Sequence, residues 1–204
     1  MRGLYLVTPN WDDTDRLLAV TAQALEAGAA LVQYRHKEAS PELRVEQAAA
    51  LLKLCRRNGT PLVINDHLDL CQSLDADGVH LGHTDQGIAE ARARLGSGKI
   101  VGASCYGELA LARAAQAAGA SYVAFGGFYP SPVKKYSFVT PPERVSEARA
   151  EFSLPIVVIG GMTPQNAAPL VARGADMVAA ITSVYGQDDP GAAARAFGAL
   201  FVPA

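Results

Sequence analysis

The sequence has few cysteines, few lysines and no long apolar run, and each shortage excludes a class of protein. The three cysteines, Cys55, Cys71 and Cys105, lack disulfide or metal-binding spacing, so we expect buried, reduced thiols and a cytoplasmic location. Only 5 of the 18 basic residues are lysines and the net charge is −2, which disfavours a nucleic-acid partner. No apolar stretch approaches the roughly 20 residues of a membrane span, and the first residues do not resemble a signal peptide.

The signatures of nucleophilic and zinc enzymes are missing as well. The chain contains no Ser-His-Asp or Cys-His arrangement and no zinc-ligand spacing. His80 lies inside an apolar stretch, so we interpret it as a hydrogen-bonded core residue rather than a general base. The chemistry must therefore come from other polar groups.

What the sequence does contain is an alternation of strand-like and helix-like segments from end to end. Short apolar runs, typical of buried parallel strands, are each followed by an amphipathic stretch. The expected strands are Gly3–Val7, Leu31–Tyr34, Leu62–Asn65, Gly78–Leu81, Ile100–Ala103, Tyr122–Phe125, Ile156–Ile159 and Met177–Ile181. The expected helices are Asp15–Ala27, Pro41–Arg57, Leu68–Leu74, Gln86–Leu95, Glu108–Ala118, Pro141–Glu151, Pro164–Arg173 and Pro190–Phe201.

Eight such units of roughly 25 residues each are the number and size that a closed (β/α)₈ barrel requires. No linker or low-complexity segment divides the chain, so we predict an α/β protein with one TIM-barrel domain over residues 1–204. A doubly wound open sheet is the alternative. Helix starts are marked by Ser40 and Thr163, each followed by proline, and by a capping-box pattern at Thr140 and Glu143.

Carboxylates follow the third and fourth expected strands, at Asn65-Asp66 and at Asp85. Capping a helix N-terminus is the commonest role of such residues. Because the carboxyl ends of barrel strands meet at one mouth, the two carboxylates can also converge there. Mg²⁺ takes one or two protein carboxylates and completes its shell with phosphate oxygens and water. The pair therefore predicts a magnesium site, with helix capping as the alternative.

Three polar side chains continue the second strand with the period of an extended chain. Gln33, Arg35 and Lys37 alternate with other residues and so share one face. A closed barrel has no free strand edge, and cations that face its mouth require an anion nearby. We therefore expect these residues to bind an anionic ligand such as a diphosphate, the alternative being a solvated strand end.

Two further segments are candidates for phosphate binding. A long loop is expected after the sixth strand; it begins at Gly126-Gly127 and ends in Lys134-Lys135. Loops of more than about 12 residues are usually functional lids or disordered. Gly160-Gly161 and residues 179–183 end the seventh and eighth strands, where barrels often hold phosphate through backbone N–H groups. A solvated surface loop remains the alternative for the first segment.

Joined in this order, the motifs resemble the thiamine-phosphate synthase (thiamine-phosphate pyrophosphorylase) family over nearly the whole chain. The matching segments are Leu4–Thr8, Gln33–Lys37, Ile64–Asp66, Ala76–Gly82, Gly102–Ser104, Ile159–Met162 and Ala180–Thr182. The resemblance implies a transferase that condenses 4-amino-2-methyl-5-hydroxymethylpyrimidine diphosphate with 4-methyl-5-(2-phosphoethyl)thiazole, or its carboxylated form. The products would be thiamine phosphate and diphosphate, formed by a dissociative substitution assisted by one Mg²⁺ per subunit.

The family pattern also implies a role for individual residues. The pyrimidine diphosphate would be held by Gln33, Arg35, Lys37, Asn65, Ser104 and Lys134, of which Arg35, Lys37 and Lys134 would act catalytically on the leaving group. The thiazole phosphate would be held by Ser131, Val133, Gly161, Ile181 and Thr182, and Mg²⁺ by Asp66 and Asp85. The partners would be small-molecule substrates, without nucleic acid or membrane, and a homodimer is compatible with the sequence.

The sequence departs from the family pattern in a few places. Val133 stands where the family usually has threonine and lacks its hydroxyl, whereas Ser131 keeps one and Thr182 replaces a more frequent serine. Two alternatives remain: a thiazole tautomerase-like isomerase without Mg²⁺, and a non-catalytic phosphate-ligand-binding barrel. Neither would need all the charged groups that this chain has, namely Arg35, Lys37, Asp66, Asp85 and Lys134.

Overall fold

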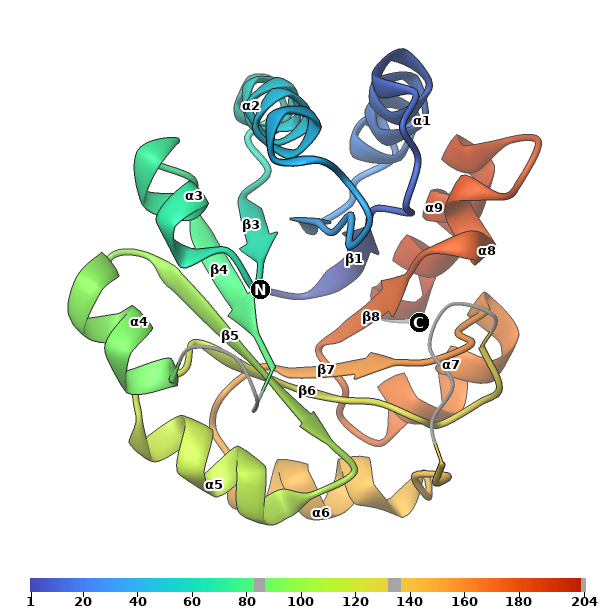
Figure 1. The fold of residues 1–204 in the computed structure, drawn as a ribbon. Helices are drawn as coiled ribbons and strands as arrows, with labels where there is room; N and C mark the ends of the chain where they lie inside the picture. Colours follow the sequence, from blue (N-terminus) through green and yellow to red (C-terminus); the bar gives the residue numbers. More distant parts are fainter. Residues whose placement is uncertain (83–86, 132–136, 203–204) are drawn as a thin grey trace.

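Parallel strands close into a barrel whose spatial order follows the sequence (Figure 1). The computed structural model describes residues 1–82, 87–131 and 137–202. Within these residues β8 pairs with β1 in parallel, with Gly3 opposite Met177, so the sheet has no free edge. This confirms the (β/α)₈ barrel and excludes the open sheet. The strands are β1 Gly3–Val7, β2 Leu31–Tyr34, β3 Leu62–Asn65, β4 Gly78–Leu81, β5 Ile100–Tyr106, β6 Tyr122–Phe125, β7 Ile156–Ile159 and β8 Met177–Ala180.

Helices surround the barrel on its outside (Figure 1). The predicted caps at Ser40 and Thr163 are confirmed: each side chain accepts a backbone N–H three residues later, and a proline follows. No membrane-spanning helix is present in the described part of the chain. The helices are α1 Thr14–Glu26, α2 Pro41–Arg57, α3 Leu68–Ser73, α4 Ile88–Leu95, α5 Leu109–Ala117, α6 Glu143–Glu151, α7 Pro164–Ala172, α8 Thr182–Tyr185 and α9 Pro190–Gly198, followed by the 3₁₀ turn η1 Ala199–Phe201.

The capping box predicted at Thr140 is wrong. Helix α6 begins at Glu143, and its N-cap position is Pro142 without a side-chain hydrogen bond. Pro141 stands directly before Pro142, and a residue before proline is disfavoured in helical geometry. The helix therefore does not begin at Pro141, the position that a cap at Thr140 would require. The Thr140 hydroxyl instead donates to the Gly126 carbonyl at 2.5 Å, and the Thr140 N–H donates to Gly127 at 2.9 Å. These bonds fix both ends of the loop that follows β6.

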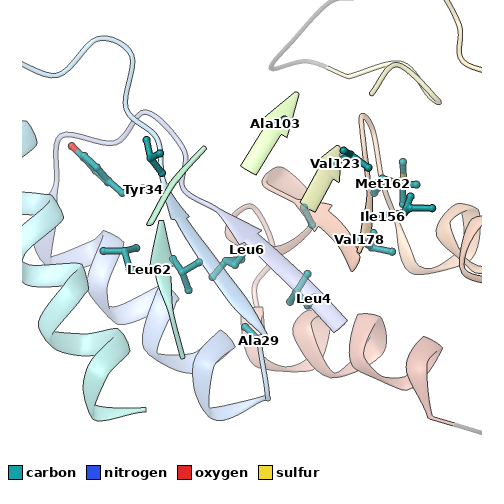
Figure 2. Close-up of a cluster of buried hydrophobic side chains, with 14 of the residues drawn as sticks. Leu4, Leu6, Ala29, Tyr34, Leu62, Ala103, Val123, Ile156, Met162 and Val178 are labelled. Carbon is teal, nitrogen blue, oxygen red and sulfur yellow. The ribbon is translucent and has the colours of Figure 1, made fainter. Parts of the chain in front are cut away.

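The apolar residues form two layers separated by the barrel wall. Because side chains alternate across a strand, Leu4 and Leu6 point out toward the helices while Tyr5 and Val7 point into the barrel. Figure 2 shows part of the outer layer, with Leu4, Leu6 and Leu62 between strands and helices. The cysteines belong to this outer layer and are free, as predicted, and burial raises the pKa of the Cys71 thiol to about 11.

Candidate active site

A cavity of about 360 Å³ opens at the carboxyl ends of the strands. This end of a (β/α)₈ barrel is where the catalytic groups of such enzymes lie, because the loops after the strands converge there. Every strand, or the residue that directly follows it, contributes to the lining; the strand residues include Val7, Gln33, Asn65, His80, Ser104, Ala124, Ile159 and Ala180. The cavity is therefore the candidate active site.

The side chains at alternate positions from the end of β2 onward share one face, as predicted. Gln33, Arg35 and Lys37 all line this cavity. Thr8, which follows β1 and is fully buried, holds the backbone of Arg35: its hydroxyl accepts the Arg35 N–H at 2.7 Å and donates to the Arg35 carbonyl at 3.1 Å. The sequence alone gave no signal for this contact. It keeps the chain extended past the end of the strand, so that Arg35 and Lys37 continue on one face.

Asp66 lies in the cavity beside an amide and a cation. Its Oδ2 accepts a hydrogen bond from Asn65 Nδ2 at 2.6 Å and lies 3.3 Å from Lys37 Nζ. The backbone of Asp66 is left-handed, with φ of 63°, a conformation that non-glycine residues adopt rarely and often at functional sites. The N-cap of α3 is His67, without a side-chain cap bond, so the capping alternative is wrong for Asp66.

The opposite part of the lining comes from the β6, β7 and β8 ends. Ser131, Gly161, Ile181 and Thr182 all border the cavity. The chain after β8 turns directly into the four-residue helix α8, which was not predicted, and the first N–H groups of a helix have no intrahelical acceptor. Gly161 has φ of 60°, and a Cβ there would lie 2.1 Å from the carbonyl oxygen of Pro130. The missing side chain of Gly161 thus allows its backbone to pack closely against the loop that follows β6.

Three of the predicted site residues, Asp85, Val133 and Lys134, lie outside the described residues. Among the residues that are described, no group of three or more His, Cys, Asp or Glu side chains could hold a metal ion. The predicted metal site therefore has one described carboxylate, that of Asp66, in the cavity.

Sequence reasoning missed a chain of hydrogen bonds that joins five strands beneath the cavity. Gln33 Nε2 donates to the Tyr5 hydroxyl at 2.5 Å, and the Tyr5 and Tyr122 hydroxyls lie 2.6 Å apart. His80 follows, with Nδ1 2.8 Å from the Tyr122 hydroxyl and Nε2 2.9 Å from Ser104 Oγ. His80 is thus hydrogen-bonded, as predicted, and it also lines the cavity. Period-two alternation points these side chains inward, but only the strand register places them in contact.

The fold and the cavity define a (β/α)₈-barrel enzyme with a polar site at the carboxyl ends of its strands. A family model described as thiamine monophosphate synthase matches residues 4–184. The chain belongs to this family. Its activity is accordingly that of a thiamine-phosphate synthase, a transferase.

Individual relatives agree with the family match. A thiamine-phosphate synthase of Janthinobacterium sp. is 62% identical over 98% of this chain and 97% of its own length. A thiamine-phosphate synthase of Methylobacillus flagellatus is 50% identical over 98% of this chain and 96% of its own length. The solved thiamine phosphate pyrophosphorylase of Pyrococcus furiosus superposes with a TM-score of 0.86 at 29% identity, covering 97% of this chain and 94% of that one. A Salmonella typhimurium 3-hexulose-6-phosphate synthase, at 16% identity, TM-score 0.75 and 98% coverage of both chains, shares the fold.

Proposed function

We propose that this enzyme joins 4-amino-2-methyl-5-hydroxymethylpyrimidine diphosphate to 4-methyl-5-(2-phosphoethyl)thiazole or its carboxylated form, releasing diphosphate. The observation that carries the proposal is the convergence of Arg35, Lys37, Asn65 and Asp66 on one cavity. Two cations and an amide beside a carboxylate suit a ligand that carries both phosphate and a divalent ion. The buried, free cysteines support the cytoplasmic location expected from the sequence.

The diphosphate lies, in this proposal, at the β2, β3 and β5 ends of the cavity. Arg35 and Lys37 supply charge-assisted hydrogen bonds to it, Asn65 and Ser104 supply neutral ones, and Gln33 holds the pyrimidine ring beside it. Lys134 would join them from the loop after β6. The thiazole phosphate lies across the cavity, held by Ser131 and by backbone N–H groups at Gly161, Ile181 and Thr182. Val133 would pack beside it without a hydrogen bond.

A magnesium ion fits the donor set that the residues offer. The Asp66 carboxylate is a hard oxygen ligand, fixed in the cavity by the Asn65 amide and already paired with the positive charge of Lys37. We propose that Asp66 and Asp85 hold one Mg²⁺. When bound, the ion neutralises negative charge on the diphosphate.

The substitution is dissociative in this proposal. The bond between the pyrimidine methylene carbon and the diphosphate oxygen breaks, and its electron pair leaves with the diphosphate. The thiazole nitrogen then gives its lone pair to the methylene cation and forms the new C–N bond. Arg35, Lys37 and Lys134 stabilise the charge that grows on the leaving oxygen. No general base is needed, because the ring nitrogen that attacks carries no proton.

Diphosphate release tests the proposal against both alternatives. The synthase should release one diphosphate per thiamine phosphate, only when both substrates and Mg²⁺ are present. A thiazole tautomerase-like isomerase would act on the thiazole alone and without Mg²⁺. A non-catalytic binding barrel would bind phosphate ligands and release nothing. The relatives described above are named as synthases, which favours the first outcome.

Replacing Gly161 by alanine should impair the thiazole side of the cavity selectively. The new Cβ would lie 2.1 Å from a backbone oxygen of Pro130, so the loop that carries Ser131 must move. Overpacking of this kind typically costs about 1–3 kcal/mol, and we expect the KM for the thiazole phosphate to rise about tenfold. The KM for the pyrimidine diphosphate should change little in steady-state kinetics.

The matched control for Gly161→Ala is Gly28→Ala. Gly28 also has positive φ, 92°, but a Cβ there would meet nothing within 4 Å. It should lose only about 1 kcal/mol of stability from backbone strain and keep both KM values. Equal KM changes in the two variants would mean that strain, and not displacement of the loop, causes the defect.

A further inference from the structure

The buried hydrogen-bond chain beneath the cavity connects two polar groups that line it. Gln33 and Ser104 stand at its ends and line the cavity, while Tyr122 in its middle is completely buried. Tyr5 and His80 form the links between them. Because each link needs one donor and one acceptor, the hydrogen that one residue gives determines what the next can give. The two ends are therefore not independent.

Packing holds the middle of the chain in one arrangement. Gly102 lies between His80 and Tyr122 in the strand register, and a Cβ at Gly102 would lie 2.1 Å from Tyr122 Cζ. The absent side chain lets the His80 and Tyr122 rings stack above it, with centroids 5.7 Å apart and planes at 14°. Tyr5 meets Tyr122 edge to face at 5.7 Å. The Tyr122 hydroxyl is thereby fixed between Tyr5 and His80.

Counting hydrogens gives the chain a direction. Burial raises the pKa of both Tyr5 and Tyr122 well above the usual value, so each hydroxyl keeps its single hydrogen. Since Gln33 donates to Tyr5, the Tyr5 hydrogen must go to Tyr122, or it would be buried without an acceptor. Tyr122 then donates to Nδ1 of His80, and the hydrogen on Nε2 is donated to Ser104. The Ser104 hydroxyl hydrogen is left for the cavity.

The opposite direction would present the wrong groups to the substrates. Ser104 would donate to His80, and Gln33 would have to turn its carbonyl to Tyr5 and its NH₂ to the cavity. Ser104 could then only accept hydrogen bonds from a ligand. Diphosphate oxygens also only accept, so the pair would repel instead of binding. The first direction is the one that suits a diphosphate.

We propose that Tyr5, Tyr122 and His80 are positioning residues that set the donors and acceptors of the pyrimidine diphosphate site. Gln33 presents its Oε1 to an N–H group on the pyrimidine ring, and Ser104 presents its hydroxyl hydrogen to a diphosphate oxygen. The inference rests on the proposed function, which supplies the diphosphate. With Oε1 of Gln33 turned to the ring, the site selects aminopyrimidine diphosphates over analogues in which the amino group is replaced by a group without N–H.

The tautomer of His80 tests the direction without any measurement of activity. The full chain is labelled with ¹⁵N-histidine, and the His80 signals are assigned by their loss in His80→Gln. We expect His80 to carry its hydrogen on Nε2 and none on Nδ1. A hydrogen on Nδ1, alone or together with one on Nε2, would overturn the proposal, because Tyr122 could then no longer donate to His80.

Kinetics of Tyr122→Phe test the consequence for the substrate. We expect the KM for the pyrimidine diphosphate to rise about tenfold, the usual scale of one hydrogen bond, while the KM for the thiazole phosphate stays within about twofold. The preference for the amino substrate over its 4-methoxy analogue should fall by the same factor. Tyr5→Phe breaks the chain one link earlier and should behave alike. Equal changes in both KM values, or an unchanged preference, would overturn the proposal.

The control for these variants is Tyr185→Phe. Tyr185 is also buried, and its hydroxyl hydrogen-bonds to Thr21 on helix α1, outside the chain that joins Gln33 to Ser104. Removing this hydroxyl should leave the amino preference unchanged. If the wild-type protein released no diphosphate, the proposed function would fail, and the His80 tautomer would still decide the direction of the chain.

Discussion

Replacing Asp66 or Asp85 by asparagine is expected to lower kcat/KM by at least about two decades. Each change removes one charge from the carboxylate pair proposed to hold Mg²⁺ and leaves a neutral amide, a much weaker ligand for a hard cation. For Asp66 it also ends the 3.3 Å ion pair with Lys37, which loses its nearest described anion in the cavity. When turnover is measured against Mg²⁺ concentration, both variants should saturate only at a much higher concentration than the wild type.

Asp75→Asn is the matched control for Asp66→Asn. Asp75 is another aspartate with left-handed backbone, φ of 53°, and its carboxylate pairs with Lys99 at 2.6 Å on the surface. Asparagine tolerates this conformation, so both variants should keep the wild-type far-UV circular dichroism. Near wild-type turnover in Asp66→Asn would contradict the metal assignment. A comparable loss of turnover in Asp75→Asn would mean that damage to the fold, and not loss of the metal, explains both variants.

Lys134→Ala is expected to reduce kcat/KM by roughly one to two decades, and Lys135→Ala by far less. A charge-assisted hydrogen bond to the leaving group is typically worth about 1.5–3 kcal/mol. Lys134 follows Ser131, a residue that lines the cavity, by three positions in the sequence. The family pattern gives Lys135 no role, which makes it the neighbouring control.

Single-mutant kinetics at saturating thiazole phosphate decide between the two lysines. The loss in Lys134→Ala should appear in kcat as well as in KM, because the bond strengthens as charge develops on the diphosphate. Equal losses in the two variants would mean that the register of this loop has been misassigned. Restoration of part of the activity by Lys134→Arg would support a charge contact.

The architecture could be predicted because its signals are local and repeated. Each strand is a short apolar run, each helix has its own polar face, and caps such as Ser40 and Thr163 mark where helices begin. The convergence of Gln33, Arg35 and Lys37 also followed from a local rule, the period of two in an extended chain. Local rules failed where two of them competed, as at Thr140, where the following prolines overrode the capping pattern.

The rest of the site depends on contacts between residues far apart in the sequence. Tyr5 and Tyr122 are separated by 117 positions, and nothing in either segment indicates that their hydroxyls meet. The position of Tyr122 itself depends on the register of β5 and β6 and on the missing side chain of Gly102. Helix α8 was missed because four residues are too few to show a periodic pattern.

The paired hydrogen bonds from Thr140 to Gly126 and Gly127 have a consequence for protein engineering. They close the segment after β6 at its base, so its two ends are already held together by the barrel. Lengthening a closed segment costs little, about 0.6 kcal/mol for each doubling. Residues could therefore be inserted between Gly127 and Thr140, with Ser131 and Lys134 retained, to accept bulkier thiazoles while the barrel itself is left intact.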